Sequence, residues 1–348
     1  MSELYPVSLF VNILAGLVLA LGFGLAAMAF ARRFGPMDVP GSQPHKKHDA
    51  PVPLAGGLAL VAALAAGSLL FNLPMLRDLW RILVPALLVF AIALWDDYKG
   101  LPAGVKLAGQ VLAGVLLIVF GVYVQILKPG FLGLGENVLI WFNWFITLFW
   151  IVGITNAMNL IDSMDGIVAG TSSVAVAFMI LVTLGAEQDS LLRLLTLMLG
   201  IGLGLYFFNT PPARFFLGDS GAQTIGFLLA AVSILFTPEG YPQASAWFLP
   251  ILILGVPIFD TTLVVFSRLR RRLPPHRGGL DHTYHRLVKL GLDSNRAVVL
   301  MHLATVALGC IAFLALRLEP LYANLVFLLV CLAGAAIIIY LDHRHAQP

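Results

Sequence analysis

Four short polar clusters interrupt an otherwise apolar chain, and each carries residue types that bind phosphate or a divalent cation. The clusters are Asp96-Asp97, the stretch 156–166, Gly218-Asp219-Ser220-Gly221, and the stretch 281–286. Carboxylate and amide oxygens are ligands that Mg²⁺ prefers. Histidine and arginine donate hydrogen bonds to phosphate oxygens. The residue types therefore indicate chemistry on a phosphate group accompanied by its cation.

The most specific pattern places four oxygen-bearing side chains at every third residue, namely Asn156, Asn159, Asp162 and Asp165. On a helix this spacing lines one face, so we expect the four to point in a common direction. Such groups at the end of an apolar helix are costly unless they face water, a metal or a polar ligand. The alternative interpretation is a polar seam satisfied between neighbouring helices.

Asp96 and Asp97 end an apolar segment, and Lys106 follows on the same short loop or the first turn of the next helix. Adjacent side chains diverge on a helix, so the two carboxylates are expected to do different jobs. Two carboxylates and a lysine at one membrane interface suit a phosphate and its cation. The alternative is a solvated helix end with a turn at Gly100 and Pro102.

Asp219 lies in a glycine-flanked turn just ahead of another apolar segment. Either Asp219 or Ser220 could simply be the N-cap of a helix. A helix N-terminus with glycines nearby is also an anion site, and a carboxylate beside it can hold the cation that accompanies a phosphate. Together with the other clusters, the second interpretation is favoured.

The last cluster places His282, His285 and Arg286 within five residues, a set that fits phosphate oxygens. A zinc site is disfavoured because no HExxH motif or cysteine cluster accompanies the histidines. The arginines at 268–272 are expected to anchor the topology of the preceding segment. Cys310 and Cys331 are interpreted as packing residues.

The composition predicts a polytopic membrane protein of the all-α class, because 348 residues are 59% hydrophobic and only 11% charged, with a mean hydropathy of +0.93. Stretches of roughly 17 to 25 apolar residues cross the hydrocarbon as helices. Eleven such segments are predicted: 8–30, 54–72, 81–95, 103–122, 138–158, 167–185, 190–208, 222–237, 246–267, 297–316 and 320–341.

The distribution of basic residues predicts how the chain is oriented in the membrane. Lysine and arginine gather in alternate connections, and the richer side is expected to be cytoplasmic. The N-terminus is then outside and the C-terminus inside. The chain is expected to form one catalytic domain, 1–348, with its polar clusters on one side. The cytoplasmic connections would be 32–53, 96–106, 156–167, 209–221 and 268–296.

The order of the motifs DDxxG, NxxNxxDxxDG, GDSG and HxxHR resembles the polyprenyl-phosphate N-acetylhexosamine-1-phosphate transferases, which are of the glycosyltransferase 4 type. The resemblance covers residues 38 to 291. His45-Lys46-Lys47-His48 with the following Pro51-Val52-Pro53 looks like the family's first cytoplasmic loop, and the run Val256 to Thr261 like its ninth span. Eleven spans with an external N-terminus are similar to the undecaprenyl-phosphate N-acetylglucosamine branch, whereas the muramoyl-pentapeptide branch has ten.

Two departures from the family pattern leave the sugar open. Leu54 and Ala55 stand where relatives usually have an arginine, and Tyr284 interrupts what is often a denser histidine motif. Both positions would help to contact the nucleotide sugar. The departures leave the reaction class intact.

The resemblance implies an enzyme that transfers a sugar-1-phosphate, with N-acetylglucosamine the expected sugar, from a UDP-sugar to undecaprenyl phosphate and releases UMP. This would be the first membrane step of cell-envelope polysaccharide synthesis, at the bacterial inner membrane with the active site facing the cytoplasm. The implied cofactor is Mg²⁺, which Mn²⁺ could replace. The implied partners are the two substrates and the bilayer, with no nucleic acid, and a homodimer is possible. The implied roles are catalysis by Asp96, Asp97, Lys106 and Asp162, metal binding by Asn159 and Asp219, and substrate binding by Lys46, His48, Asn156, Asp165, His282, His285 and Arg286.

A membrane transporter or flippase is the alternative from another class, because membrane-embedded carboxylates often mark transport pathways. Transporters typically contain paired repeats and interrupted helices near the midplane, and the sequence shows neither. Asp260 is the only carboxylate clearly inside a predicted span. The transferase is therefore the favoured prediction.

Overall fold

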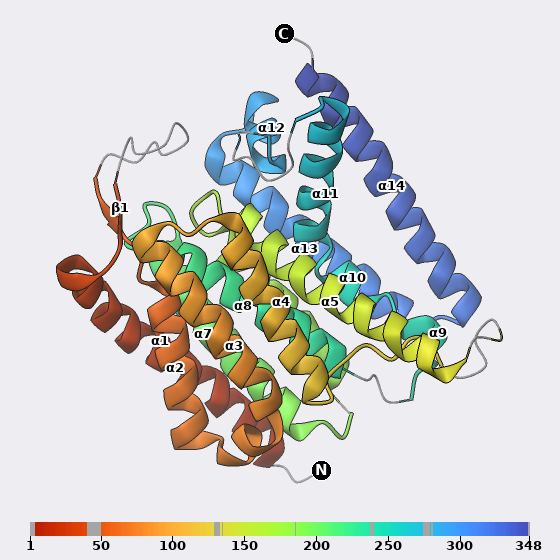
Figure 1. Cartoon of the computed structure of the whole chain (residues 1–348), viewed down its shortest axis with the longest axis horizontal. Helices are drawn as coiled ribbons and strands as arrows, with labels where there is room; N and C mark the ends of the chain where they lie inside the picture. The colour runs from red at the N-terminus through yellow and green to blue at the C-terminus, as the bar shows by residue number, and fades with distance from the viewer. Residues whose placement is uncertain are drawn as a thin grey trace.

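Long apolar helices form the whole framework of the protein (Figure 1). The structure is a computed structural model and describes residues 4–39, 50–128, 133, 135–184, 186–236, 240–273, 279 and 281–346. The helices are α1 (Leu4–Phe34), α2 (Gly56–Phe71), α3 (Leu73–Lys99), α4 (Ala103–Val119), α5 (Glu136–Ile161), α6 (Ile167–Thr183), α7 (Asp189–Asn209), α8 (Gly218–Leu235), α9 (Gln243–Ala246), α10 (Leu249–Ile253), α11 (Gly255–Arg270), α12 (Thr283–Lys289), α13 (Ser294–Ala315) and α14 (Pro320–Ala346). The predicted all-α membrane class is confirmed.

The number of membrane spans is only partly established by helix length. Within the described ranges, seven helices are long and apolar enough to cross a bilayer, and a pair bent by 67° between α10 and α11 makes up to eight. The helices α2, α4 and α6 have 16, 17 and 17 residues. At about 1.5 Å per residue they fall short of a hydrocarbon core of about 30 Å. Each of the eleven predicted segments coincides with a helix or with the bent pair, but eleven crossings stay a prediction.

The core of the bundle centres on α8. In the 18-residue apolar stretch of this helix 78% of the residues are buried, whereas only 6% are buried in the corresponding stretch of α14. α8 packs against α2, α3 and α5. Gly226 permits the close approach of α5, because a Cβ there would lie 2.9 Å from the Cα of Thr155. The helix that begins with Gly218 and Asp219 is therefore held on several sides by the rest of the bundle.

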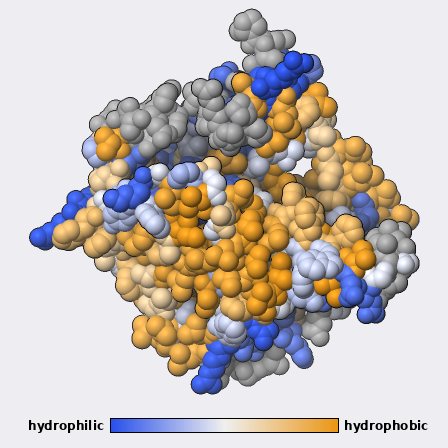
Figure 2. All heavy atoms as spheres, in the orientation of Figure 1, coloured by the Kyte–Doolittle hydropathy of each residue, from blue (hydrophilic) through white to orange (hydrophobic). Residues whose placement is uncertain are grey.

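On the face shown in Figure 2, the middle of the bundle is apolar and hydrophilic residues gather at its edges. On α14, the exposed residues include Leu328, Leu329 and Leu332. Cys310 and Cys331 are exposed as well, so the prediction that they are packing residues was wrong. Exposed side chains of this kind suit a helix that faces lipid, where every backbone group is satisfied within the helix. The membrane character predicted from composition is thus visible in the distribution of side chains.

β1 (Met37–Asp38) and β2 (Val52–Pro53) form a short antiparallel ribbon. The residues that follow β2 lie against the loop just before α8. The next residue, Leu54, forms a parallel bridge with Phe216. The amide of Ala55 donates to the carbonyl of Phe216 at 3.2 Å, and the amide of Gly57 donates to the carbonyl of Leu217 at 3.1 Å. The segment that departs from the family's arginine pattern therefore braces the turn that carries Asp219.

Candidate active site

Lys106 joins two carboxylates from different helices at one end of the bundle. Its Nζ lies 2.7 Å from Oδ2 of Asp96 on α3 and 2.8 Å from Oδ2 of Asp219 on α8. α3 ends at Gly100, which has a φ of 68°, and α4 begins just after Pro102. The tight turn lets the first turn of α4 return Lys106 to Asp96. Two of the predicted clusters and the predicted lysine therefore meet.

Asp97 contacts the start of α8 through the backbone. Its Oδ1 accepts the amide of Asp219 at 2.8 Å, and its Oδ2 accepts the amide of Ser220 at 3.1 Å. These amides have no partners within the helix, and a carboxylate is favoured at the positive end of the helix dipole. A Cβ at Gly218, whose φ is 69°, would lie 2.8 Å from the Asp97 carboxylate. Asp96 and Asp97 thus make different contacts, as their divergence on the helix predicts.

The series from Asn156 to Asp165 does not line one helix face, and this expectation was wrong. Helix α5 ends at Ile161, and Asp162 is its C-cap residue with φ −74° and ψ 56°. The chain then turns through Gly166, whose φ of 80° favours glycine. Only the two asparagines lie on the helix, whereas both aspartates lie in the turn before α6.

Antiparallel packing of α5 and α8 brings this turn to the start of α8. Gly226 lies against Thr155, so counting in opposite directions along the two helices places Asn159 near residue 222 and Asp162 near Asp219. Burial raises the pKa of Asp162 to about 8, and the negative charges of Asp219, Asp97 and Asp165 add to the effect. Several carboxylates are therefore crowded near Lys106, and a further cation is the natural complement.

Three buried or half-buried amides, which the sequence analysis did not single out as a group, support Asp219. Oδ2 of Asp219 accepts from Nε2 of Gln223 at 3.1 Å. Gln110 donates to Oε1 of Gln223 at 2.9 Å, and Asn156 donates to Oε1 of Gln110 at 2.6 Å. Asn156 also donates to the carbonyl of Val152 at 2.8 Å. The predicted substrate-binding residue Asn156 therefore belongs to a hydrogen-bond network between helices. In the sequence, the presence of amide side chains inside apolar segments could have indicated this network.

Asn209 is another residue that the sequence analysis missed. It is buried at the end of α7, where its Oδ1 accepts the amide of Gly166 at 3.0 Å and its Nδ2 donates to the carbonyl of Phe215 at 3.2 Å. Asp165 adds a parallel link, because its Oδ2 accepts the amide of Ala213 at 3.0 Å. Both links tie the turn that carries Asp162 to the loop that carries Asp219.

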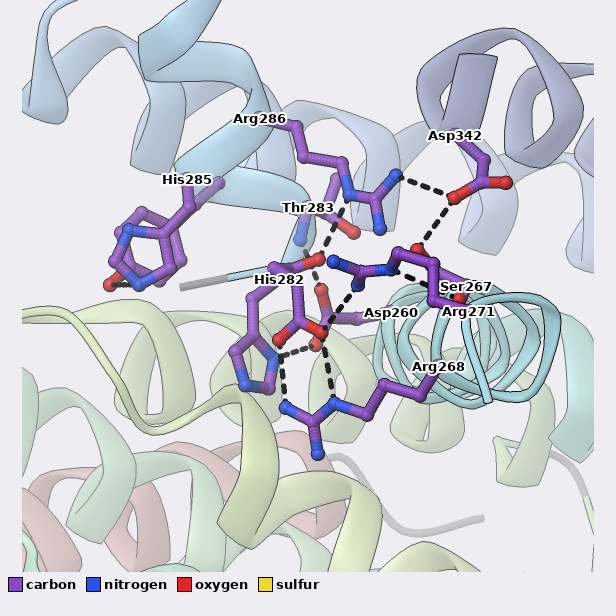
Figure 3. Close-up of polar contacts among 11 residues, drawn as sticks. Asp260, Ser267, Arg268, Arg271, His282, Thr283, His285, Arg286 and Asp342 are labelled. Carbon is purple, nitrogen blue, oxygen red and sulfur yellow. Dashed lines mark hydrogen bonds and ion pairs between the residues drawn. The ribbon is translucent and has the colours of Figure 1, made fainter. Parts of the chain in front are cut away.

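The histidine segment reaches the same turn through Tyr284. Its hydroxyl donates to the carbonyl of Ser163 at 3.2 Å, and its ring lies 3.9 Å, centroid to centroid, from that of His285. His282 is the N-cap residue of α12, and its Nδ1 lies 2.8 Å from Oδ2 of Asp260 (Figure 3). Two clusters, Asp96-Asp97 and the start of α8, therefore contact each other directly. The turn of Asp162 adjoins them through the packing of α5 on α8, and the histidine segment contacts that turn at Ser163.

Arg286 points into the protein interior, where only 2% of it is exposed. Its Nε donates to the carbonyl of Asp281 at 2.9 Å, and its Nη1 lies 3.5 Å from Oδ1 of Asp342 on α14 (Figure 3). Contacts with Asp281 and Asp342 hold α12 against the end of α14. The structure thus places the guanidinium of this predicted substrate-binding residue beside Asp281 and Asp342.

Asp281 is held in two directions by the arginines that end α11. Arg268 binds its two carboxylate oxygens at 2.7 and 2.9 Å, and Arg271 adds a contact at 3.1 Å. Burial alone would raise the pKa of Asp281, but the hydrogen bonds and charge of Arg268 outweigh burial and lower this pKa to about 2. Arg268, which is 3% exposed, therefore pairs inside the protein and is not the surface anchor expected from the sequence.

Two predicted site residues, Lys46 and His48, lie outside the described residues. Among the residues that are described, no three histidine, cysteine, aspartate or glutamate side chains form a metal-binding group. Asn159 is half-buried at the end of α5. Any ion held here would therefore rely on an asparagine, on water or on a substrate phosphate in addition to carboxylates.

Comparison with known proteins agrees with the motifs. The glycosyl transferase family 4 model matches residues 79–237. The chain is 32% identical over 273 residues, 78% of its length and 75% of the relative's, to the probable undecaprenyl-phosphate N-acetylglucosaminyl 1-phosphate transferase of Bacillus subtilis. It is 31% identical, over 81% of this chain and 75% of the relative, to the decaprenyl-phosphate N-acetylglucosaminephosphotransferase of Mycolicibacterium smegmatis. It is 28% identical, over 83% and 79%, to the undecaprenyl-phosphate alpha-N-acetylglucosaminyl 1-phosphate transferase of Escherichia coli K12. The chain therefore belongs to glycosyl transferase family 4, among the membrane enzymes that transfer an N-acetylhexosamine-1-phosphate to a polyprenyl phosphate.

Proposed function

We propose that the protein transfers N-acetylglucosamine-1-phosphate from UDP-N-acetylglucosamine to undecaprenyl phosphate, giving undecaprenyl-diphospho-N-acetylglucosamine and UMP. The names of the relatives support both substrates. The observation that carries the proposal is the position of Lys106, within 2.8 Å of both Asp96 and Asp219 and beside the turn of Asp162. The positive charge of Lys106 can offset the repulsion that arises when one anionic substrate attacks another.

The reaction makes modest demands on acid–base chemistry. A phosphate monoester has a second pKa of about 6, so the lipid phosphate is largely dianionic at neutral pH. One of its oxygens forms a bond to the β-phosphorus of the UDP-sugar, the bond from that phosphorus to the bridging oxygen breaks, and UMP leaves. Catalysis then rests on positioning and on neutralising crowded negative charge. We assign Lys106 to the lipid phosphate, with Asp96 and Asp162 positioning the reacting groups.

The residues present fit a hard divalent cation such as Mg²⁺. Carboxylates at Asp219, Asp162 and Asp97 are close enough to repel one another, and Asn159 supplies a neutral oxygen at the adjacent level of α5. We propose Asn159 and Asp219 as the protein ligands, with waters and substrate phosphates completing the shell. A bound Mg²⁺ would neutralise the diphosphate of the donor, and Mn²⁺ has similar ligand preferences.

Binding of the nucleotide sugar is assigned to Asp165, His282 and His285, with Lys46 and His48 from the preceding loop. Tyr284 links the histidine segment to the turn of Asp162, which supports placing these groups at one end of the donor. Asn156 and Arg286 are engaged in internal contacts. For these two residues we propose a supporting role in place of direct substrate contact.

We propose that the site faces the cytoplasm of a bacterial cell, with the N-terminus outside, the C-terminus inside and eleven spans in the inner membrane. The excess of lysine and arginine in the connections at this end supports that orientation. The connections 32–53, 96–106, 156–167, 209–221 and 268–296 would then form the site. Cysteine substitutions in these connections, labelled from either side of intact membranes, test the orientation.

The function is tested with purified protein, undecaprenyl phosphate, Mg²⁺ and a panel of UDP-sugars, by following UMP release. UMP is expected from UDP-N-acetylglucosamine, and omission of either the lipid phosphate or the cation should abolish it. UMP only from another UDP-hexosamine would correct the sugar while keeping the reaction class. No UMP from any donor would overturn the proposal and favour the transport alternative.

A further inference from the structure

Asp260 is a carboxylate buried within α11, with no exposed surface. Both of its carboxylate oxygens accept hydrogen bonds from the segment His282-Thr283. Oδ2 accepts from Nδ1 of His282 at 2.8 Å, and Oδ1 accepts from the backbone amide of Thr283 at 2.6 Å (Figure 3). A buried carboxylate is costly unless it is paired and hydrogen-bonded, and these two contacts pair it.

The contact with His282 determines which ring nitrogen is available to other groups. A carboxylate can only accept, so the proton at the contact belongs to Nδ1 of the imidazole. Nε2 then lies on the opposite side of the ring, and among the described residues it has no hydrogen-bond partner. Only 6% of His282 is exposed, so this nitrogen is presented from a ring that is otherwise enclosed.

The segment that carries His282 adjoins the turn of Asp162. The rings of His282 and His285 lie 6.3 Å apart. The residue between them that contacts the rest of the site is Tyr284, whose hydroxyl binds the carbonyl of Ser163, next to Asp162. The amide bond from Thr283 to Asp260 fixes the backbone at the start of α12. Asp260 therefore controls both the ring and the peptide that carries it.

We propose that Asp260 is a positioning residue, which holds His282 by Nδ1 so that Nε2 contacts a phosphate oxygen of the UDP-sugar. Between the Asp260 carboxylate and a bound diphosphate, an imidazole that carries a proton on each nitrogen donates to both sides. Asp260 itself touches no substrate and acts through His282. The inference rests on the proposed function and adds a residue to its donor site.

The alternative is that Asp260 merely stabilises the fold. Steady-state kinetics separate the two roles. If Asp260 positions His282, its substitution changes the KM for the UDP-sugar, and this change disappears when His282 is absent. We expect Asp260→Asn to raise the KM for the UDP-sugar about tenfold and to leave the KM for undecaprenyl phosphate within twofold. In a His282→Ala background, the same substitution should change kcat/KM by less than twofold. Thr262→Val is the matched control on α11, because Thr262 is exposed and its hydroxyl binds only the carbonyl of Ile258.

A second pair of variants keeps the test sharp if Asp260→Asn does not fold. The amide nitrogen of asparagine reaches about as far as Nδ1 of histidine, and that of glutamine about as far as Nε2. His282→Asn should therefore keep the contact with Asp260 and the melting temperature but lose at least tenfold in kcat/KM for the UDP-sugar. His282→Gln should retain more of the donor binding and less of the stability.

The outcomes distinguish the inference from the function on which it rests. A wild-type protein that releases no UMP overturns the proposed function and the inference with it. An active wild type overturns the inference alone in two cases: the effects of Asp260→Asn and His282→Ala multiply independently, or His282→Asn is as active as wild type.

Discussion

Asp97 binds the backbone of Asp219, with 2.8 Å between its Oδ1 and the Asp219 amide nitrogen. Of the two neighbouring aspartates, Asp97 therefore orients the first turn of α8, while Asp96 binds Lys106. The two carboxylates at the end of α3 thus reach the start of α8 in different ways, Asp97 through the helix backbone and Asp96 through Lys106.

Removal of this contact should reduce both stability and activity. Asp97→Ala deletes two hydrogen bonds to a charged acceptor, a loss on the order of 2 kcal/mol, and frees the turn that carries Asp219. We expect a lower melting temperature and at least a tenfold drop in UMP release. Asp293→Ala is the matched control, because Asp293 caps α13 by accepting the amide of Arg296 at 2.9 Å, and its loss should cost about 1 kcal/mol with turnover within twofold. Equal activity losses in both variants would contradict the role of Asp97.

The amide network predicts a non-additive effect on stability. Gln223→Leu removes a donor to Asp219 and leaves the amide of Gln110 without one of its partners, which costs about 1 to 3 kcal/mol for an unsatisfied buried group. Gln110→Leu leaves Oε1 of Gln223 without its donor and also removes the acceptor for Nδ2 of Asn156. In the double variant no unmatched Gln110–Gln223 pair remains, so its loss in thermal stability should be smaller than the sum of the two single losses. Strict additivity would show that the two glutamines act separately.

The hydroxyl of Tyr284 is predicted to matter for catalysis beyond its worth as a hydrogen bond. Tyr284→Phe keeps the ring against His285 but removes the hydroxyl's bonds to the carbonyl of Ser163 and to Nε2 of His285, so the turn of Asp162 loses its link to the histidine segment. We expect a three- to tenfold fall in kcat/KM for the UDP-sugar and a stability loss of about 1 kcal/mol. Tyr98→Phe removes a similar hydroxyl-to-carbonyl bond at an exposed position and should leave kinetics unchanged. A silent Tyr284→Phe would refute the link.

Acid stability should depend on Asp281. Its pKa of about 2 lies below the ordinary value of 3.8, so the folded protein binds this proton more weakly than the unfolded chain does. The resulting stabilisation, about 2 kcal/mol, is complete above about pH 4 and is lost as the pH falls towards 2. The melting temperature of the detergent-solubilised protein should decline over that interval, and Asp281→Asn should lower it at pH 7 and flatten the decline. An unchanged decline in the variant would assign the acid sensitivity to other groups.

Segment length and hydrophobicity were sufficient to locate the helices, because a bilayer demands long apolar runs with internal hydrogen bonds. They could not show that α10 and α11 bend by 67°, although Pro250, Gly255 and Pro257 are residues that weaken a helix. Nor could they show that α5 ends at Ile161, because the three-residue spacing of the polar groups continues beyond it.

Residue chemistry alone identified Asp96, Lys106 and Asp219, whose types are costly at a membrane interface without partners. Their partners depend on packing between helices far apart in the sequence. The bond from Asp97 to the α8 backbone, the burial of Arg286 against Asp342 and the amides of Gln110 and Gln223 arise only when α3, α4, α8 and α14 are in place. A sequence motif identifies the residues, but the packing of the helices determines which of them can contact the substrate.

The most direct test of the acidic cluster is UMP release by purified Asp219→Asn compared with wild type, at several Mg²⁺ concentrations and with melting temperatures recorded for both. Asparagine keeps an oxygen acceptor for Lys106 and Gln223 but removes a negative charge beside Asp162. If the acidic cluster has the proposed role, wild-type turnover requires Mg²⁺ and undecaprenyl phosphate. The variant is then folded but at least a hundredfold slower, which corresponds to an increase of about 3 kcal/mol in activation free energy. Full Mg²⁺-dependent turnover by Asp219→Asn would contradict it.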